Sequence, residues 1–141
     1  MDNHGGWMET AFNTRDPVYL QVVRLFKERI VTGLLAAGEA IPSRREIASL
    51  LKMNPNTAQR AYKEMEEQGL IVTEGNSPSR ITRDEDVLRN IRSELLGEAV
   101  RTFVGSIRNM QVPLQEIVAL VQEEYESDAQ RRDRKPGGEG A

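Results

Sequence analysis

The segment PSRREIASLLKMNPNTAQRAYKEM, residues 42–65, limits the fold more than any other part of the chain, because two short helix patterns meet there with almost no connection. Ser43 and, one turn later, Glu46 form a capping box, which predicts that a helix begins at Ser43. Asn54 followed by Pro55 is a second start signal, since asparagine caps helices well and proline suits the first helical position. Two short helices joined this closely are typical of a helix-turn-helix unit.

The elements on either side complete the predicted fold. Before the pair, Asp16 as cap, Pro17 as first helical residue and Gly33 as terminator indicate a helix with one apolar stripe. After the third helix, which Gly69 ends, the pieces LIVT and RIT are separated by the turn sequence EGNSPS and predict a two-stranded hairpin. The expected fold class is mainly α: a winged helix-turn-helix domain with a two-stranded β-hairpin wing, followed by a small two-helix C-terminal region.

Apolar patterning divides the chain into four parts. Residues 1–14 are predicted to be a flexible leader, 15–83 the winged helix-turn-helix domain, 84–130 a two-helix dimerisation region and 131–141 a disordered tail. The last two helices carry apolar bands too wide for one pair of helices to bury, which predicts that a second copy of the chain covers them. The expected dimer contacts are Leu88, Ile91, Leu95, Ala99, Phe103, Ile107, Leu114, Ile117 and Val121.

Composition argues against several classes of function. The chain has no cysteine, and its only histidine, His4, lies in the leader, so we expect neither a thiolate site nor a metal site. It has no Ser/His/Asp set and no phosphate-binding glycine loop, so we expect no enzyme activity and no cofactor. No apolar run approaches a membrane span and the start does not resemble a signal peptide, so the expected compartment is the cytoplasm.

The overall charge of −3 is unevenly distributed, and one segment of the chain is basic. Residues 15–83 carry eleven Lys and Arg against eight Asp and Glu, whereas residues 84–141 carry eight against twelve. Phosphate attraction acts within about 10 Å in ordinary buffer, so the local balance permits a nucleic-acid partner for the first segment. The acidic run 84–86 would suit a divalent ion or the first turn of a helix, and we prefer the capping interpretation.

The third helix has two distinct faces. Its inward stripe is Ala58, Ala61, Tyr62 and Met65, and its other positions are polar throughout. Polar side chains on an outer helix face are usually only solvated, so the pattern by itself does not establish a binding surface.

Three sequence stretches, taken in order, indicate which kind of helix-turn-helix protein this is. They are PVYLQ in the first helix, GLLAAGEAIPSRREIA through the second and NPNTAQRAYKEMEEQGLI through the third. Over residues 17–73 the chain resembles the DNA-binding domain of the GntR superfamily of bacterial transcription regulators. The NPNT turn and the short tail are most similar to the YtrA subfamily, whose members dimerise through two C-terminal helices. The resemblance implies double-stranded DNA and a second copy of the chain as partners, and the lack of an apolar span predicts no membrane partner.

The resemblance also implies that some side chains contact DNA, namely Ser43, Arg45, Asn56, Thr57 and Arg60. Four further side chains are expected contacts without that support: Arg44 at a variable position, Gln59 and Lys63 on the same exposed side of the third helix, and Arg80 in the wing. Arg60 is the first choice for reading a base, because arginine pairs bidentately with guanine. The wing departs from the family pattern, since Glu74 stands where a positive charge would help, and Arg80 is therefore expected to reach phosphates only.

The expected function is that of a homodimeric, sequence-specific transcriptional repressor that binds a pseudo-palindromic operator through residues 55–68. By resemblance, the expected targets are genes for ABC transporters or envelope-stress functions, while activation and a small-molecule effector both stay open. The alternative is a winged helix that binds proteins, favoured by the acidic residues Glu64, Glu66, Glu67 and Glu74. The salt dependence of binding distinguishes DNA binding from protein binding, because binding through several phosphates weakens steeply as the salt concentration rises.

Overall fold

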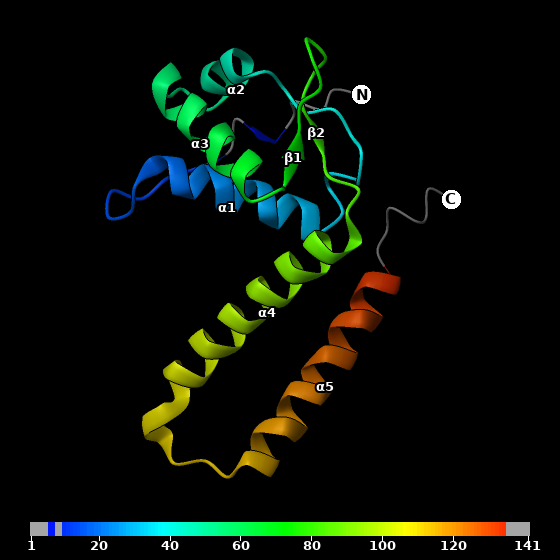
Figure 1. Cartoon of the computed structure of the whole chain (residues 1–141). Helices are drawn as coiled ribbons and strands as arrows, with labels where there is room; N and C mark the ends of the chain where they lie inside the picture. The colour runs from blue at the N-terminus through cyan, green and yellow to red at the C-terminus, as the bar shows by residue number, and fades with distance from the viewer. Residues whose placement is uncertain (1–5, 8–9, 135–141) are drawn as a thin grey trace. The chain divides into compact units, whose positions relative to one another are not determined.

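A computed structural model of the chain describes residues 6–7 and 10–134. The described residues form a mainly helical fold with one two-stranded antiparallel sheet, which confirms the predicted fold class (Figure 1). The elements in chain order are α1 (Val18–Val31), α2 (Arg44–Leu50), α3 (Pro55–Glu67), β1 (Ile71–Val72), β2 (Arg80–Ile81), α4 (Glu85–Ile107), the 3-10 helix η2 (Arg108–Met110) and α5 (Leu114–Asp133). They divide into two units, residues 1–98 and 99–141, and each unit is described by itself.

The helix signals at the central joint are confirmed. In the capping box, the Ser43 hydroxyl accepts the Glu46 N–H at 3.1 Å and the Glu46 carboxylate accepts the Ser43 N–H at 2.8 Å. At the start of α3, the Asn54 side chain accepts the Asn56 N–H at 2.7 Å. Between α2 and α3 the chain turns at Lys52, whose φ of 55° lies in the left-handed region. The joint is therefore as short as the sequence predicts.

The start of α1 differs from the prediction. Asp16 does not cap the helix, which begins at Val18 with Pro17 as its cap residue and without a side-chain cap hydrogen bond. Instead, the Asn13 side chain accepts the Asp16 N–H at 3.0 Å, and the Gln21 amide donates to the Asp16 carbonyl at 2.8 Å. Asparagine competes well for nearby backbone groups, so a turn built on Asn13 precedes the helix in place of a cap.

The core of the first unit lies between α1, α2, α3 and the hairpin. Phe26 and Tyr62 are fully buried and meet edge to face, with ring centroids 5.7 Å apart. The predicted inward stripe of α3 is also fully buried: Ala58, Ala61, Tyr62 and Met65. Burial of a large apolar side chain contributes about 1.5–3 kcal/mol, so this stripe determines which face of α3 stays exposed.

The hairpin is confirmed and carries a further segment. Strands β1 and β2 pair antiparallel, with Ile71 opposite Ile81. Residues 38–41 run along β2 as well, and the Gly38 N–H donates to the Ile81 carbonyl at 2.8 Å. The sequence did not predict this pairing, because AAGEAIP has the composition of a simple connector.

The predicted flexible leader contains one residue of the core. The Trp7 side chain is 1% exposed, its ring centroid lies 4.9 Å from that of Phe26, and the Arg29 guanidinium carbon lies 3.8 Å from the Trp7 ring centroid. The prediction is therefore wrong for Trp7. A single tryptophan beside glycines has no periodic pattern that would indicate burial. Residues 1–5 and 8–9 lie outside the described residues.

The first half of α4 packs within the first unit, which ends at Glu98 and not at the expected position 83. Ile91 is 3% exposed and belongs to the core, and Leu88 and Leu95 pack against the same cluster. These three residues were predicted to contact a second copy. The prediction is wrong for Ile91, and Leu88 and Leu95 are partly covered by their own chain.

Two ion pairs also join this part of α4 to α1. The buried Lys27 ammonium lies 3.1 Å and 3.2 Å from the two carboxylate oxygens of Glu94, and Arg24 pairs with Glu98. The Glu94 side chain is 45% exposed, and ion pairs in contact with water contribute only about 0–1 kcal/mol. Packing of Ile91 therefore supplies more of the attachment than the charges do.

The second unit comprises the end of α4, η2 and α5. Of the predicted dimer contacts in this unit, Ala99, Phe103, Leu114 and Val121 are exposed, and Ile107 and Ile117 are half-buried. Other large apolar side chains are exposed here too: Val100, Val104, Met110, Val118, Leu120 and Tyr125. The interface itself stays a prediction.

The predicted disordered tail, residues 131–141, begins inside a helix. Helix α5 continues through Asp133, and residues 135–141 lie outside the described residues. Among the helices that the structure describes, none combines the length and the apolar character needed to cross a membrane.

Candidate nucleic-acid interface

The outer face of α3 is polar and exposed. The side chains of Asn56, Gln59, Arg60 and Lys63 are exposed, and that of Thr57 is half-buried. The opposite stripe is completely buried, so the helix cannot turn another face outward without losing its core contacts. The five candidates that the sequence placed on this helix therefore share one accessible side.

Arg60 does not extend freely into solvent. Its guanidinium carbon lies 4.0 Å from the ring centroid of Tyr19 on α1, and its Nη2 donates a long hydrogen bond of 3.4 Å to the Tyr19 hydroxyl. In the sequence, Tyr19 is one of the regularly spaced apolar positions of the first helix. No local pattern connects it with Arg60, because the contact depends on how α1 and α3 pack.

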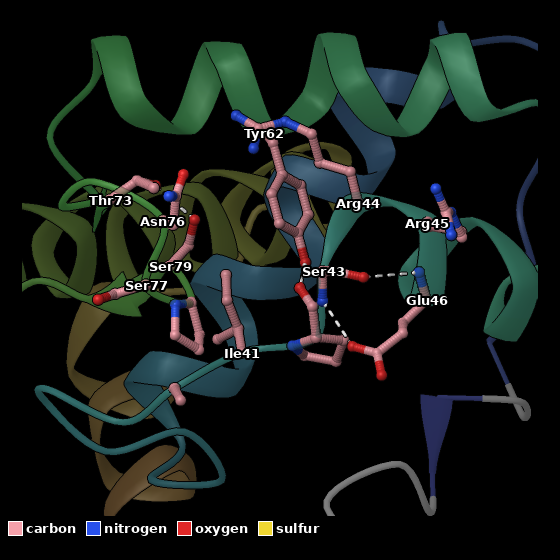
Figure 2. A pocket seen from close by; sticks show the side chains of 13 residues that line it. Ile41, Ser43, Arg44, Arg45, Glu46, Tyr62, Thr73, Asn76, Ser77 and Ser79 are labelled. Atoms are coloured by element: carbon pink, nitrogen blue, oxygen red, sulfur yellow. Dashed lines mark hydrogen bonds between the residues drawn. The ribbon is translucent and has the colours of Figure 1, made fainter.

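A second group of candidates borders an open groove of about 1090 Å³ between the start of α2 and the wing loop, residues 73–79 (Figure 2). Ser43 and Arg45 are exposed at this edge. The Ser43 hydroxyl uses a lone pair to cap α2, and that bond leaves its own hydrogen available for an acceptor such as a phosphate oxygen.

Arg44 is held by an ion pair in the same groove. Its Nη2 lies 3.2 Å from Glu66 Oε1 at the end of α3, and its guanidinium carbon lies 5.2 Å from the ring centroid of Tyr62. The other Glu66 oxygen accepts the Thr73 hydroxyl at 2.8 Å. Arg44 therefore differs from Arg45, because an acidic residue already neutralises its charge.

Tyr62 connects α3 to the segment that precedes α2. Its ring points from α3 into the groove, and its hydroxyl donates to the Pro42 carbonyl at 2.5 Å (Figure 2). Burial raises the pKa of the Tyr62 phenol well above its ordinary value, and the nearby charge of Arg44 opposes this shift. The phenol thus keeps its proton near neutral pH and fixes the start of α2 relative to α3.

The wing has few side chains that are free to contact DNA. The Arg80 guanidinium donates to the Gly38 carbonyl at 3.1 Å, so this predicted phosphate contact is tied back to its own chain. Ser79 is buried and bonds to the Thr73 hydroxyl. Glu74, Asn76 and Ser77 are exposed at the tip, which presents no basic side chain.

Comparison with known proteins decides what kind of helix-turn-helix this is. The family described as "Bacterial regulatory proteins, gntR family" matches residues 18–81. An uncharacterized HTH-type transcriptional regulator of Bacillus subtilis, YhcF, is 31% identical over 111 residues, which cover 79% of this chain and 92% of that protein. The chain belongs to the gntR family.

Other relatives and solved structures agree. The repressor YtrA of Bacillus subtilis is 42% identical over 57 residues, covering 40% of this gntR-family chain and 44% of YtrA. A GntR family transcriptional regulator from Listeria monocytogenes has a TM-score of 0.71 at 30% identity, covering 79% of this chain and 98% of that one. A transcriptional regulator from Oenococcus oeni has a TM-score of 0.67 at 32% identity, covering 82% and 97%. The protein is thus a DNA-binding transcriptional regulator of the gntR family, not an enzyme.

The acidic run at the start of α4 has a structural role in this gntR-family chain. The Asp84 carboxylate accepts the N–H groups of Asp86 at 2.9 Å and Val87 at 3.4 Å, which confirms the capping interpretation. In the part of the chain that the structure describes, no three His, Cys, Asp or Glu residues gather in a way that would hold a metal ion.

Proposed function

We propose that this protein is a homodimeric repressor that recognises a pseudo-palindromic operator through the exposed face of α3. The observation that carries the proposal is the division of α3 into a fully buried apolar stripe and an exposed face with Asn56, Gln59, Arg60 and Lys63. These residue types match base edges, since arginine pairs with guanine and asparagine or glutamine with adenine. Repression is favoured because the relative YtrA is itself a repressor.

The start of α2 complements this face by contacting the DNA backbone. Ser43 and Arg45 are exposed there, and hydroxyl and guanidinium groups are common phosphate ligands. Such contacts set the position and orientation of α3 without selecting a sequence. We assign smaller contributions to Arg44 and Arg80, because Glu66 and the Gly38 carbonyl already engage them.

The second unit supplies the dimer. Phe103, Leu114 and Val121 expose large apolar surfaces that a second copy of the unit would bury. The interface that we propose comprises the predicted contacts from Ala99 onward and leaves out Leu88, Ile91 and Leu95, which pack against the core of their own chain. A two-fold dimer presents its recognition helices about 34–36 Å apart, one turn of DNA, which requires an inverted repeat. Access to bacterial chromosomal DNA implies action in the cytoplasm.

The test is selection of bound duplexes from a random pool with the full-length protein, at low and at near-physiological salt. We expect an enriched inverted repeat whose half-sites lie about 10 base pairs apart and which persists at the higher salt. Enrichment of one unrepeated half-site would contradict the dimer. Binding that neither selects a sequence nor weakens steeply with salt would favour the protein-interaction alternative.

A further inference from the structure

We propose, on the basis of the function above, that Tyr19 is a positioning residue: it holds the Arg60 guanidinium in place to read one base of each operator half-site. Tyr19 lies on α1 and itself contacts no base in this proposal. Its role is to determine how strongly the base opposite Arg60 is preferred.

The Arg60 guanidinium lies over the Tyr19 ring in a cation–π contact. The Arg60 guanidinium carbon lies 4.0 Å from the Tyr19 ring centroid, well inside the distance of about 6 Å over which an aromatic face attracts a cation. The Nη2 atom also reaches the Tyr19 hydroxyl, at 3.4 Å. Tyr19 is half-buried and packs against the core, whereas Arg60 is exposed, so the ring is the fixed partner of the pair.

Hydrogen bonds of the Gln21 side chain restrain the backbone next to Tyr19. Tyr19 lies in the first turn of α1, and that turn is fastened by the Gln21 side chain. The Gln21 amide donates to the carbonyls of Asn13 at 3.0 Å and Asp16 at 2.8 Å, and its oxygen accepts the Asn13 N–H at 3.0 Å. These bonds restrain the backbone from which the Tyr19 ring projects.

A cation–π contact suits base reading because it occupies few of the donors of the guanidinium. Arginine has five N–H donors, and of these the Tyr19 hydroxyl engages one on Nη2, so most remain available for a base. Guanine O6 and N7 accept from such donors. A flexible arginine must lose its rotational freedom when it binds, whereas an arginine already ordered on Tyr19 loses less. The ion pair between Arg44 and Glu66, by contrast, neutralises the charge of the guanidinium.

The test compares two substitutions of Tyr19 in the full-length protein. Tyr19→Leu removes the aromatic face, and Tyr19→Phe keeps the face but removes the hydroxyl. Each variant is titrated with the selected operator, with operators carrying each other base at the position that Arg60→Ala identifies, and with random duplex. We expect Tyr19→Leu to lower the preference for the correct base about two- to fivefold, and Tyr19→Phe to retain most of it. Affinity for random duplex should not change.

A purely structural role for Tyr19 would give a different pattern. It would weaken binding of Tyr19→Leu to every duplex alike, random duplex included, whereas loss of the Arg60 contact lowers only the preference for one base. In a protein that already carries Arg60→Ala, Tyr19→Leu should have no further effect on base preference. A full preference in Tyr19→Leu, or tighter operator binding because the contact competes with DNA, would overturn the proposal.

A measurement on the free wild-type protein keeps the proposal testable if Tyr19→Leu does not fold. The ring should shift the NMR signals of the Arg60 side chain upfield in the wild type and in Tyr19→Phe. Random-coil shifts for Arg60 in both proteins would show that the contact does not exist in solution. If the wild type selects no sequence, the proposed function fails whatever the state of the contact. If it selects one and Tyr19→Leu selects it equally well, only the role of Tyr19 fails.

Discussion

Ile91→Ala tests whether the first half of α4 is part of the DNA-binding unit. Ile91 is buried in the core of that unit, and its neighbours Leu88 and Leu95 on the same helix face are partly buried. Truncation of a buried isoleucine to alanine costs about 2–5 kcal/mol, depending on how far the surroundings relax. Partly buried neighbours can move into the space, so we expect about 2–3 kcal/mol, a large part of the roughly 5–15 kcal/mol that stabilises a typical domain.

The assay is urea unfolding of the full-length protein, followed by tryptophan fluorescence. Trp7 is the only tryptophan and is buried in the first unit, so its emission reports the unfolding of that unit. With slopes of about 1–3 kcal/mol per molar urea, Ile91→Ala should lower the midpoint by about 0.7–3 M. The matched control is Arg92→Ala, an exposed neighbour on the same helix, which should change stability by less than about 0.5 kcal/mol.

Dilution separates a core role for Ile91 from a role at the dimer interface. A core residue lowers the free energy of unfolding of the first unit at every protein concentration, whereas an interface residue acts only where the dimer is populated. If Ile91→Ala and Arg92→Ala unfold at the same urea concentration, or if the effect of Ile91→Ala disappears on dilution, our assignment of Ile91 to the first unit is wrong.

Three further substitutions test other contacts. Glu66→Gln releases Arg44 from its ion pair, and filter-binding titrations should show DNA affinity rising about two- to fivefold at low salt, with a smaller gain at high salt; weaker binding would contradict this. Asn54→Ala removes the cap of α3 and should lower the free energy of unfolding by about 0.5–2 kcal/mol in urea titrations, whereas Asn56→Ala, which keeps the Asn54 cap, should not. Val121→Glu should shift the protein towards monomer in sedimentation without changing the unfolding of the first unit; an undisturbed dimer would refute the proposed interface.

The parts of the fold that the sequence predicted depend on residues a few positions apart. The capping box of Ser43 and Glu46 and the cap at Asn54 are local signals, because the donor and the acceptor lie within one helical turn. The buried stripe of α3 follows in the same way from the spacing of its apolar residues. These signals sufficed for the helix-turn-helix, and with it for the outward face of α3.

The parts that the sequence did not predict depend on residues far apart in the chain. Tyr19 and Arg60 look like an apolar stripe position and a free arginine until α1 and α3 pack together. Periodicity also placed Ile91 and Phe103 on one apolar stripe, yet the first is covered by its own chain and the second is exposed. A pattern of spacing shows which side of a helix is apolar and not which surface covers it.

The central claim is that the exposed face of α3 reads sequence, and Arg60→Ala tests it most directly. The measurement is the ratio of affinities for the selected operator and for random duplex, for the wild type and for Arg60→Ala at the same salt concentration. We predict that the variant loses about 1–3 kcal/mol on the operator and almost nothing on random duplex, with base preference relaxed at one position of each half-site. An equal loss on both duplexes would show that Arg60 contacts only phosphate, and would contradict the claim.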